Sequence, residues 1–412
     1  MARRGSVAGL DIGTTKVCAV MGDVDEDGEI HIVGAGTSPS TGMRRGVVVD
    51  LDSTAGAIEQ AVDRAERMAG TKVTSAYVAV SGEHITSADS RGVVAVARGD
   101  HEIGDADVAR VVDAARMAAL PASDREIIHL LPRDFVVDGQ EGIKRPVGMF
   151  GTRLEVEAHI VTGVATALAN LARCVQRAGI DVEAMVLEPL AAAEAVLTAA
   201  ERDLGVVVAD LGGGTTSMGV FANGGLCHMA ILPVAGAHLT SDIAVGMRTP
   251  MPEAEKLKVR WGAATPGIVT EGEMIEVFGT GGREPRVLPR RVLAEYIEPR
   301  LDEIFAMIRG EIRRSGYTHR IPAGVVLTGG GAQLEGLDAY AESRLGLPSR
   351  IGAPAEIGGL VEAVRGPAFS TGVGLALYGT RARQHVGAAL GNGARTFWDR
   401  TRTWLRGVLE TG

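Results

Sequence analysis

Two short segments of this 412-residue chain place an aspartate at the end of an apolar run and follow it with a glycine- and threonine-rich turn. The first contains Asp11 and then Gly13, Thr14, Thr15 and Lys16. Such a turn presents backbone N–H groups that can cradle an anion, and Lys16 adds a point charge toward the terminal phosphates. Asp11 can hold a Mg²⁺ ion through the ion's waters. The segment predicts a phosphate loop, with an ordinary β-hairpin and an incidental lysine as the alternative.

A second segment in the middle of the chain repeats this plan. Asp210 ends an apolar strand, and glycines that permit close backbone approach come between it and a threonine. These residues are Gly212, Gly213, Gly214 and Thr215. A chance tri-glycine turn is the alternative here. If both segments are phosphate loops, Asp11 and Asp210 meet across a cleft and hold one hydrated Mg²⁺ with its nucleotide from opposite sides.

A third strand, near the end of the chain, also stops at glycines. The sequence TGGGAQLEG contains Gly329, Gly330 and Gly331 before a helix, whose N-terminus can face a phosphate or a ribose. A chance tri-glycine turn in the second segment would not predict this third loop. The order of the three loops therefore predicts a nucleotide cleft.

Three charged residues outside the loops are further candidates for this cleft. Glu188 precedes a proline that starts a helix of small residues, and its carboxylate either orients an attacking water or only interacts with the helix dipole. Glu255 and Lys258 stand three residues apart in PEAEKLKVRWG. They form either a solvated pair on one helix face or groups that reach a base and ribose.

The elements that must position these residues fall into two lobes, because 412 residues exceed one compact core. The similarity of GLDIGTTKVCAV and VADLGGGTTSMGVF indicates a duplicated half. We predict the following segments: first-lobe core 1–82, inserted α/β subdomain 83–161, first-lobe core 162–200, second-lobe core 201–236, second-lobe insert 237–316, second-lobe core 317–366, return helix to the first lobe 367–380, linker 381–394 and terminal helix 395–412.

Composition excludes several other classes of protein. The formal net charge of -9 argues against a nucleic-acid-binding function, because that needs a concentrated basic face. The three cysteines lie far apart without a metal-site or disulfide pattern, which favours a reducing compartment. We find neither a signal peptide nor an apolar run long enough to span a membrane, so any membrane contact is expected to be peripheral.

The end of the chain, NGARTFWDRTRTWLRGVLETG, has the pattern of an amphipathic helix that lies on an anionic membrane. At 100° per residue, the large apolar side chains fall on one arc and arginines border it. The residues that we expect to contact the membrane are Phe397, Trp398, Arg402, Trp404, Leu405, Arg406 and Val408. The alternative is a helix that packs on another protein or on the body of the molecule.

The three loops, Glu188 and PAFSTGVGLALYG resemble the actin, heat-shock chaperone and sugar-kinase superfamily of ATPases, over nearly all of the chain up to Gly379. Within it the chain is similar to FtsA, the bacterial cell-division actin homologue. The long segments that carry this similarity are SVAGLDIGTTKVCAVMGD, VDGQEGIKRPVGMFGTRLEVEAHIVTG and VVADLGGGTTSMGVF. The resemblance implies an α/β actin-like two-lobe ATPase fold, with an inserted small α/β subdomain in the first lobe and a C-terminal amphipathic helix.

The resemblance also implies a site and partners. ATP and Mg²⁺ would bind at the three loops, Glu255 and Lys258 would lie near the adenosine, and Glu188 would take the water-orienting position. The chain would self-assemble into filaments and bind the C-terminal peptide of FtsZ, for which Arg300 in an EPR context is the candidate contact. Its inserted subdomain would contact later division proteins or a neighbouring subunit.

The expected protein is thus a peripheral membrane protein on the cytoplasmic face of the inner membrane at the division site, with ATP hydrolysis slow or absent. Two alternatives remain open at this point. One is a pilus-assembly actin homologue that binds a membrane-protein peptide, and the other is a small-molecule kinase, which would need a catalytic base and a substrate pocket between the lobes.

Overall fold

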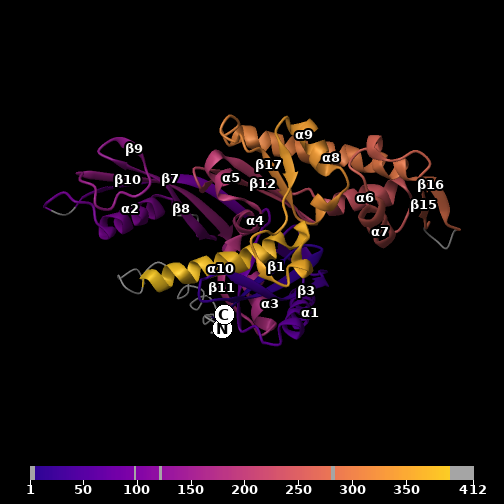
Figure 1. Ribbon diagram of the computed structural model, residues 1–412, viewed down its shortest axis with the longest axis horizontal. Coiled ribbons are helices and arrows are strands. Elements are labelled where there is room, and N and C mark those ends of the chain that lie inside the picture. Colours follow the sequence, from indigo (N-terminus) through magenta and orange to yellow (C-terminus); the bar gives the residue numbers. More distant parts are fainter. Residues whose placement is uncertain (1–4, 97–98, 120–122, 280–283, 390–412) are drawn as a thin grey trace.

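A computed structural model describes residues 5–96, 99–119, 123–279 and 284–389. The chain folds into two lobes that face each other, with a third, smaller body beside them (Figure 1). Each lobe is built around its own β-sheet, and each sheet has helices packed against it.

The sheet of the first lobe has the strand order β11-β6-β1-β2-β3-β19. Helices α1 and α3 lie on the same side of this lobe, and glycines in β3 admit the backbone of α1 closely. On the other face, Gly9 of β1 admits the backbone of α10. The bounds are β1 Gly5–Ile12, β2 Lys16–Val24, β3 Ile30–Pro39, β6 Ser75–Val80, β11 Asp181–Leu187, β19 Gly358–Gly359, α1 Leu51–Ala69, α3 Ala165–Arg177, α4 Glu188–Val196 and α10 Ser370–Ala389; a short hairpin, β4 Met43–Arg44 and β5 Val47–Val48, precedes α1.

The sheet of the second lobe, β14-β13-β12-β17-β18, repeats the plan of the first. In both lobes an antiparallel hairpin, β1–β2 or β12–β13, has a parallel neighbour on one side and an antiparallel strand on the other. This repetition confirms the duplicated half. The bounds are β12 Val206–Leu211, β13 Thr216–Ala222, β14 Gly225–Leu232, β17 Val325–Thr328, β18 Ser349–Ile351, α5 Ala199–Leu204, α6 Gly236–Gly246, α7 Met251–Trp261, β15 Met274–Val277, β16 Arg286–Pro289, α8 Arg290–Arg314 and α9 Leu337–Leu345.

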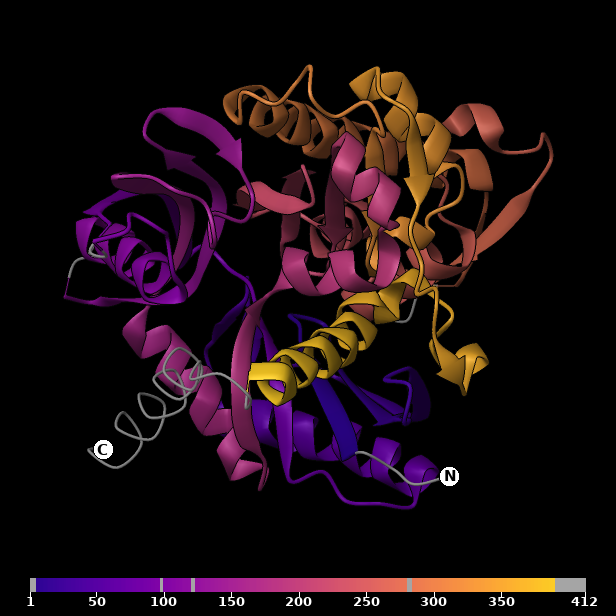
Figure 2. The same ribbon diagram turned by 60° about the vertical axis from the view of Figure 1, so that its left-hand side comes forward.

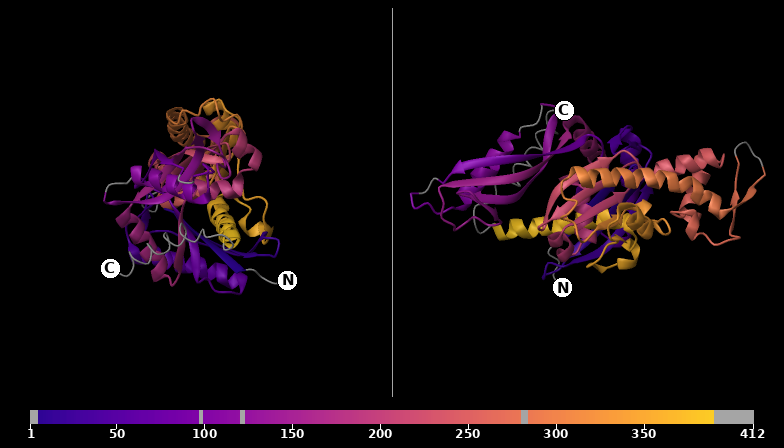
Figure 3. Two further views of the ribbon diagram at one scale, coloured as in Figure 1. Left: turned by 90° about the vertical axis from the view of Figure 1, so that its left-hand side faces the viewer. Right: turned by 90° about the horizontal axis from the view of Figure 1, so that it is seen from above.

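The third body is a four-stranded sheet, β7-β10-β8-β9, covered by α2, and it has a hydrophobic cluster of its own. It is inserted between β6 and α3 of the first lobe, and it lies beside both lobes (Figure 2). The hairpin β15–β16 of the second lobe lies at the opposite end of the molecule (Figure 3). The bounds are β7 Ile85–Ala95, α2 Asp105–Ala118, β8 Arg125–Val137, β9 Gln140–Ile143 and β10 Arg153–Val164. The predicted two-lobe α/β architecture with an inserted subdomain is therefore confirmed.

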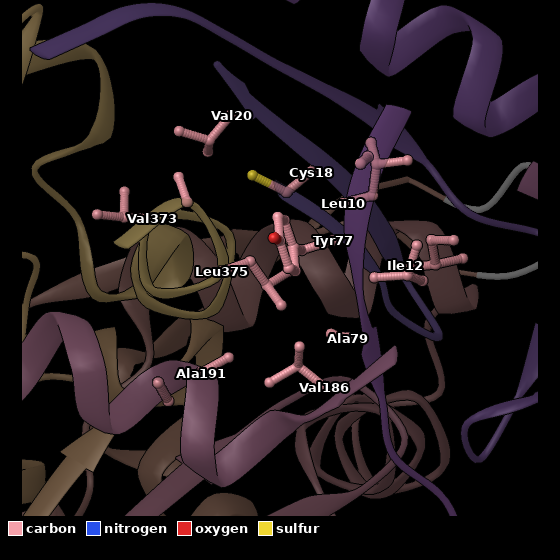
Figure 4. Packing of buried hydrophobic residues seen from close by; sticks show 14 of the residues in the cluster. Leu10, Ile12, Cys18, Val20, Tyr77, Ala79, Val186, Ala191, Val373 and Leu375 are labelled. Carbon is pink, nitrogen blue, oxygen red and sulfur yellow. The ribbon is translucent and has the colours of Figure 1, made fainter. Parts of the chain in front are cut away.

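Helix α10 runs across the first-lobe sheet and packs against α4. Its residues Val373 and Leu375 are fully buried among side chains of β1, β2 and β6 (Figure 4). At Gly374 the two helices touch backbone to backbone, because a Cβ added there would lie 1.7 Å from the carbonyl oxygen of Ala191.

The prediction that this helix ends at residue 380 was wrong, since α10 continues to Ala389. Of the predicted linker at 381–394, residues 390–394 lie outside the described part of the chain. The segment contains good helix formers and no proline, and two of its arginines anchor it to the first lobe. Arg381 pairs with Glu194 of α4, and Arg383 donates to the Ser6 carbonyl over 2.7 Å. No helix in the described part of the chain is long and apolar enough to cross a membrane.

Two glycines inside helices provide a matched test of the α4–α10 contact. We expect Gly374→Ala to lower the melting temperature, because the added methyl group forces the helices apart, and overpacking costs about 1–3 kcal/mol. Gly310→Ala in α8 should raise it, because open space surrounds Gly310 and alanine is the better helix former by about 1 kcal/mol. Thermal unfolding followed by circular dichroism measures both changes. Equal effects of the two substitutions would contradict a close α4–α10 contact.

Candidate functional site

The two aspartates of the phosphate-loop pattern stand near the carboxyl ends of β1 and β12, where each hairpin turns. Both turns close in the same way, since Gly13 N–H donates to the Lys16 carbonyl over 2.9 Å and Gly212 N–H donates to the Thr215 carbonyl over 3.1 Å. Strand β1 runs parallel to β6 and β12 runs parallel to β17, so residues that follow β6 and β17 reach the same edges as the two turns.

The two loops lie directly against each other. A Cβ added to Gly213 would be 2.3 Å from Thr15 Oγ1, and one added to Gly214 would be 2.5 Å from Thr14 Oγ1. Only glycine allows this approach of the two lobes. A small cavity remains between the loops, and its lining includes Asp11, Gly13, Thr14, Ser81, Glu188, Gly212, Gly213, Gly214 and Thr215.

Three carboxyl groups share this interior. Burial, together with the charge of Asp11, raises the pKa of Asp210 to about 6. Burial also raises the pKa of Asp11, although Lys16 opposes the shift. The pKa of Glu188 lies well above its ordinary value, because its carboxyl is desolvated and faces both Asp210 and Asp11. Burying this much negative charge is unfavourable, and a divalent cation would offset it.

Hydroxyl groups connect Glu188 to the second loop. Ser217 Oγ donates to the Glu188 carboxyl, and the Ser81 hydroxyl lies 2.8 Å from that of Ser217 and 3.5 Å from that of Thr215. Ser81 immediately follows β6 in the first lobe, whereas Thr215 and Ser217 belong to the second. The hydroxyl cluster therefore bridges the lobes.

The start of α10 contacts the aspartate of the second loop. Thr371 Oγ1 donates to Asp210 Oδ2 over 2.8 Å, and the neighbouring Ser370 hydroxyl is 2.7 Å from that of Thr328 at the end of β17. Lys16 also reaches this region, because its ammonium group donates to the Ala368 carbonyl and lies 5.0 Å from the centroid of the Phe369 ring. The structure thus directs Lys16 toward the turn before α10.

The third glycine loop touches the second. Gly329 has a positive φ of 84°, and a Cβ there would lie 2.1 Å from Asp210 Oδ1. Gly331 packs against Leu211, whereas a Cβ on Gly330 would meet nothing within 4 Å. The third loop therefore supports Asp210 on one side and leaves space at Gly330.

Glu255 and Lys258 of α7 reach the start of α6. Lys258 Nζ donates to Glu255 over 2.7 Å, to the Thr240 hydroxyl over 2.8 Å and to the Gly236 carbonyl over 3.0 Å. Gly236 N–H in turn donates to the Gly212 carbonyl over 3.1 Å. The pair is therefore close to the second loop and is only partly solvated.

Sequence reasoning missed several polar residues that the fold adds to the site, namely Ser81, Ser217, Thr240 and Thr371. A weak signal exists for Thr371, which stands near the start of a helix of small residues. Ser217 gave no separate signal within its strand. Ser81 and Thr240 reach the site only through tertiary contacts.

Two other groups of predicted residues lie elsewhere. Arg300 is on α8, where its guanidinium group makes a bidentate pair with Asp242 of α6 over 2.7 and 3.0 Å and also contacts Glu303. The predicted membrane residues lie outside the described part of the chain; they are Phe397, Trp398, Arg402, Trp404, Leu405, Arg406 and Val408.

Two family models match the chain. The model described as cell division protein FtsA matches residues 207–374, and the SHS2 domain inserted in FtsA matches residues 82–162. Among curated relatives, the cell division protein FtsA of Pseudomonas aeruginosa is 46% identical, with 90% of this chain and 89% of that protein covered. FtsA of Escherichia coli K12 is 40% identical, with 97% of each chain covered. FtsA of Bacillus subtilis is 39% identical over 93% of this chain and 85% of that protein.

Solved structures with lower identity share the fold. The PilM–PilN type IV pilus biogenesis complex gives a TM-score of 0.66 at 18% identity, covering 92% of this chain and 99% of that one. MreB 5 of Spiroplasma citri bound to AMPPNP gives 0.57 at 14% identity, covering 94% and 99%. These similarities confirm the actin-like fold, and the MreB structure holds a nucleotide.

The buried carboxyl cluster predicts an unusual dependence of stability on pH. Because the pKa of Asp210 rises from 3.8 to about 6 on folding, its stabilising contribution is complete below pH ~4 and is lost as the pH rises through ~6. We expect Asp210→Asn to stabilise the protein without nucleotide or Mg²⁺ by about 2–3 kcal/mol near pH ~7.5, and far less near pH ~4. Denaturant unfolding at the two pH values measures the difference.

Asp27→Asn is the matched control, since Asp27 lies in an exposed turn. It should leave the stability nearly unchanged at both pH values. A loss of stability in Asp210→Asn near neutral pH would show that the ionised Asp210 carboxylate does not destabilise the folded protein.

Proposed function

Since this chain belongs to the FtsA family of bacterial cell-division proteins, we propose that it binds Mg²⁺–ATP, assembles with copies of itself and tethers FtsZ filaments to the cytoplasmic face of the inner membrane at the division site. Later division proteins would join through the inserted subdomain. The observation that carries this proposal is the course of α10, which contacts Asp210 of the cleft through Thr371 and runs to Ala389. In the sequence, the predicted membrane segment 395–412 follows shortly after.

The residues of the cleft fit a Mg²⁺–nucleotide. Asp11 and Asp210 supply carboxylates on opposite sides, and the raised pKa of each indicates a place where a cation is electrostatically favourable. Among the described residues, no three histidine, cysteine or carboxylate side chains are arranged to ligate a metal directly. We therefore assign Mg²⁺ to these aspartates through its waters, the mode that this ion prefers with phosphates. The backbone N–H groups of both glycine loops would hold the phosphates.

In this proposal, the phosphates of the nucleotide compete with the turn before α10 for the ammonium group of Lys16. Its ammonium group now contacts Ala368 and Phe369, and phosphates entering between the loops would attract it away from that turn. The contact of Gly213 with Thr15 would also widen. Nucleotide would thus change both the lobe contact and the start of α10, which is a difference in affinity between two conformations.

The state of Glu188 supports a mainly mechanical role. A general base must be ionised to accept a proton from water, and the pKa of Glu188 is held well above its ordinary value. Glu188 would therefore position a water poorly for attack unless bound Mg²⁺ restored its charge. We propose slow or absent hydrolysis on this ground, with the charge that bound Mg²⁺ gives to Glu188 as the quantity on which the rate depends.

Arg300 is the proposed contact for the acidic tip of the FtsZ peptide. Its side chain keeps 27% of its surface exposed, and Asp242 already holds the guanidinium plane in a fixed orientation. Glu303 occupies the remaining edge of the group, so the peptide carboxylate would take the place of Glu303 there. The membrane contact is assigned to residues 395–412, where the apolar arc and the arginines of the sequence support an interfacial helix.

Recruitment of FtsZ to liposomes tests the tether. We expect the full chain with Mg²⁺–ATP to carry FtsZ to vesicles that contain anionic phospholipid. Trp404→Glu should abolish vesicle binding while ATP binding persists, because a charge enters the apolar arc. Thr403→Glu adds the same charge on the opposite face and should weaken binding far less. Sedimentation with vesicles measures both.

The same assay tests Arg300. Arg300→Glu should keep vesicle binding and lose FtsZ, whereas Arg291→Glu, on the same helix and 65% exposed, should retain both. Vesicle binding without any recruitment of FtsZ by the unaltered chain would refute the tether and leave the nucleotide site to be judged separately.

A further inference from the structure

The edge strand of the second-lobe sheet, β14, packs against the inserted subdomain. It contacts β7, β8 and β10, which belong to the insert and therefore to the first lobe by chain connection. The pairing of β14 with β13 shifts register between Phe221 and Val220, so that Cys227 is an extra residue outside the regular ladder. A bulge of this kind takes backbone groups out of the ladder and needs other partners for them.

Arg133 of the insert provides such a partner. Its guanidinium group donates to the Cys227 carbonyl, and its side chain keeps only 15% of its surface exposed. Asp89 holds the group in a bidentate pair, over 2.6 and 3.1 Å, and also lies 2.7 Å from Nδ1 of the buried His159. We call Arg133, Asp89, His159 and the Cys227 carbonyl the latch.

The latch is a polar contact in which some buried nitrogen atoms have no hydrogen-bond partner. Within the described residues, Arg133 Nε and His159 Nε2 are buried and lack hydrogen-bond partners. Unsatisfied polar atoms weaken a buried contact, so this junction is less stable than an apolar one of the same size. By contrast, the interior of the insert is an apolar cluster.

The covalent attachment of the insert is much firmer. Arg125 ties together the two strands that connect the insert to the first lobe, by donating to the His84 carbonyl over 2.9 Å and to the Thr162 carbonyl over 3.1 Å. The connection begins at Ser81, whose hydroxyl lies against Thr215 and Ser217 of the second phosphate loop. The insert is thus fixed to the first lobe where Ile85 and Gly163 pair, and it is latched to the second lobe four residues further along both strands, at Asp89 and His159.

We propose that Arg133 acts as a releasable latch, which holds the inserted subdomain against the second lobe while the lobes are closed and frees it when they separate. The insert cannot follow both lobes at once. Any movement between them must therefore either break the contact of Arg133 with Cys227 or bend the connection at Ser81. The buried, partly unsatisfied latch is the weaker of the two.

The three cysteines of the chain provide the measurement. Cys227 is buried at the latch, whereas Cys18 and Cys174 are buried in the first lobe. We expect Arg133→Ala to raise the rate at which iodoacetamide alkylates Cys227 at least fivefold, with Cys18 and Cys174 unchanged. Asp89→Ala, which leaves Arg133 in place without its support, should give a smaller increase. Peptide mass spectrometry of the full chain follows each cysteine separately.

Arg153→Ala is the control, because Arg153 is an exposed arginine of the insert that pairs with Glu155 and not with the second lobe. It should leave the rate at Cys227 unchanged. Unchanged alkylation of Cys227 in both latch variants would overturn the proposal. Parallel acceleration at all three cysteines in both variants would do so as well, since exposure would then follow general unfolding.

Repeating the alkylation experiment with Mg²⁺–ATP distinguishes a failure of this inference from a failure of the proposed function. Mg²⁺–ATP should accelerate alkylation of Cys227 in the unaltered chain, because phosphates between the loops would separate the lobes. Binding of a fluorescent ATP analogue is measured in parallel. Bound analogue with an unchanged rate at Cys227 would refute the coupling, whereas failure of the analogue to bind would refute the nucleotide proposal and leave the variants to decide on the latch.

Discussion

The mutual repulsion of three carboxyl groups between the lobes, one buried and two partly buried, is the interaction on which the rest of the molecule depends. The duplicated hairpins bring Asp11 and Asp210 face to face, and Glu188 joins them from the start of α4. The apolar strands behind these residues keep them out of water and so raise their pKa values. Hydroxyl groups of Ser217 and Thr371 moderate the charge. A cation that binds between these carboxyl groups would offset their repulsion and so stabilise the folded chain.

The two lobes approach so closely because their loops carry almost no side chains where they meet. Glycines of the second loop accept the threonines of the first, and Gly329 accepts the Asp210 carboxylate. This arrangement makes the interface between the lobes depend on a few backbone contacts and hydroxyls. The inserted subdomain adds a second, polar contact between the lobes at Arg133. The molecule is therefore held closed at two separate places.

The loops could be predicted from the sequence because their chemistry is local: an apolar strand, an aspartate and a tight turn lie within a dozen residues. The repeated lobe could be predicted for the same reason. Thr371 and Ser81 could not, since their contacts with Asp210 and Thr215 join residues far apart in the chain. The length of α10 was underestimated because the small and polar residues of RARQHVGAALGNGAR suggested a linker. Contacts of Arg381 and Arg383 with the first lobe support the helix there.

The bare contact of Gly374 with the Ala191 carbonyl has a further consequence. Helices usually interlock through ridges of side chains, which restrict them to a few crossing angles. At Gly374 there is no side chain to form a ridge, so backbone contact sets the separation of the two helices there. Their axes can therefore lie closer together than side-chain ridges would permit, and the Glu194 carboxylate of α4 is within reach of Arg381 further along α10.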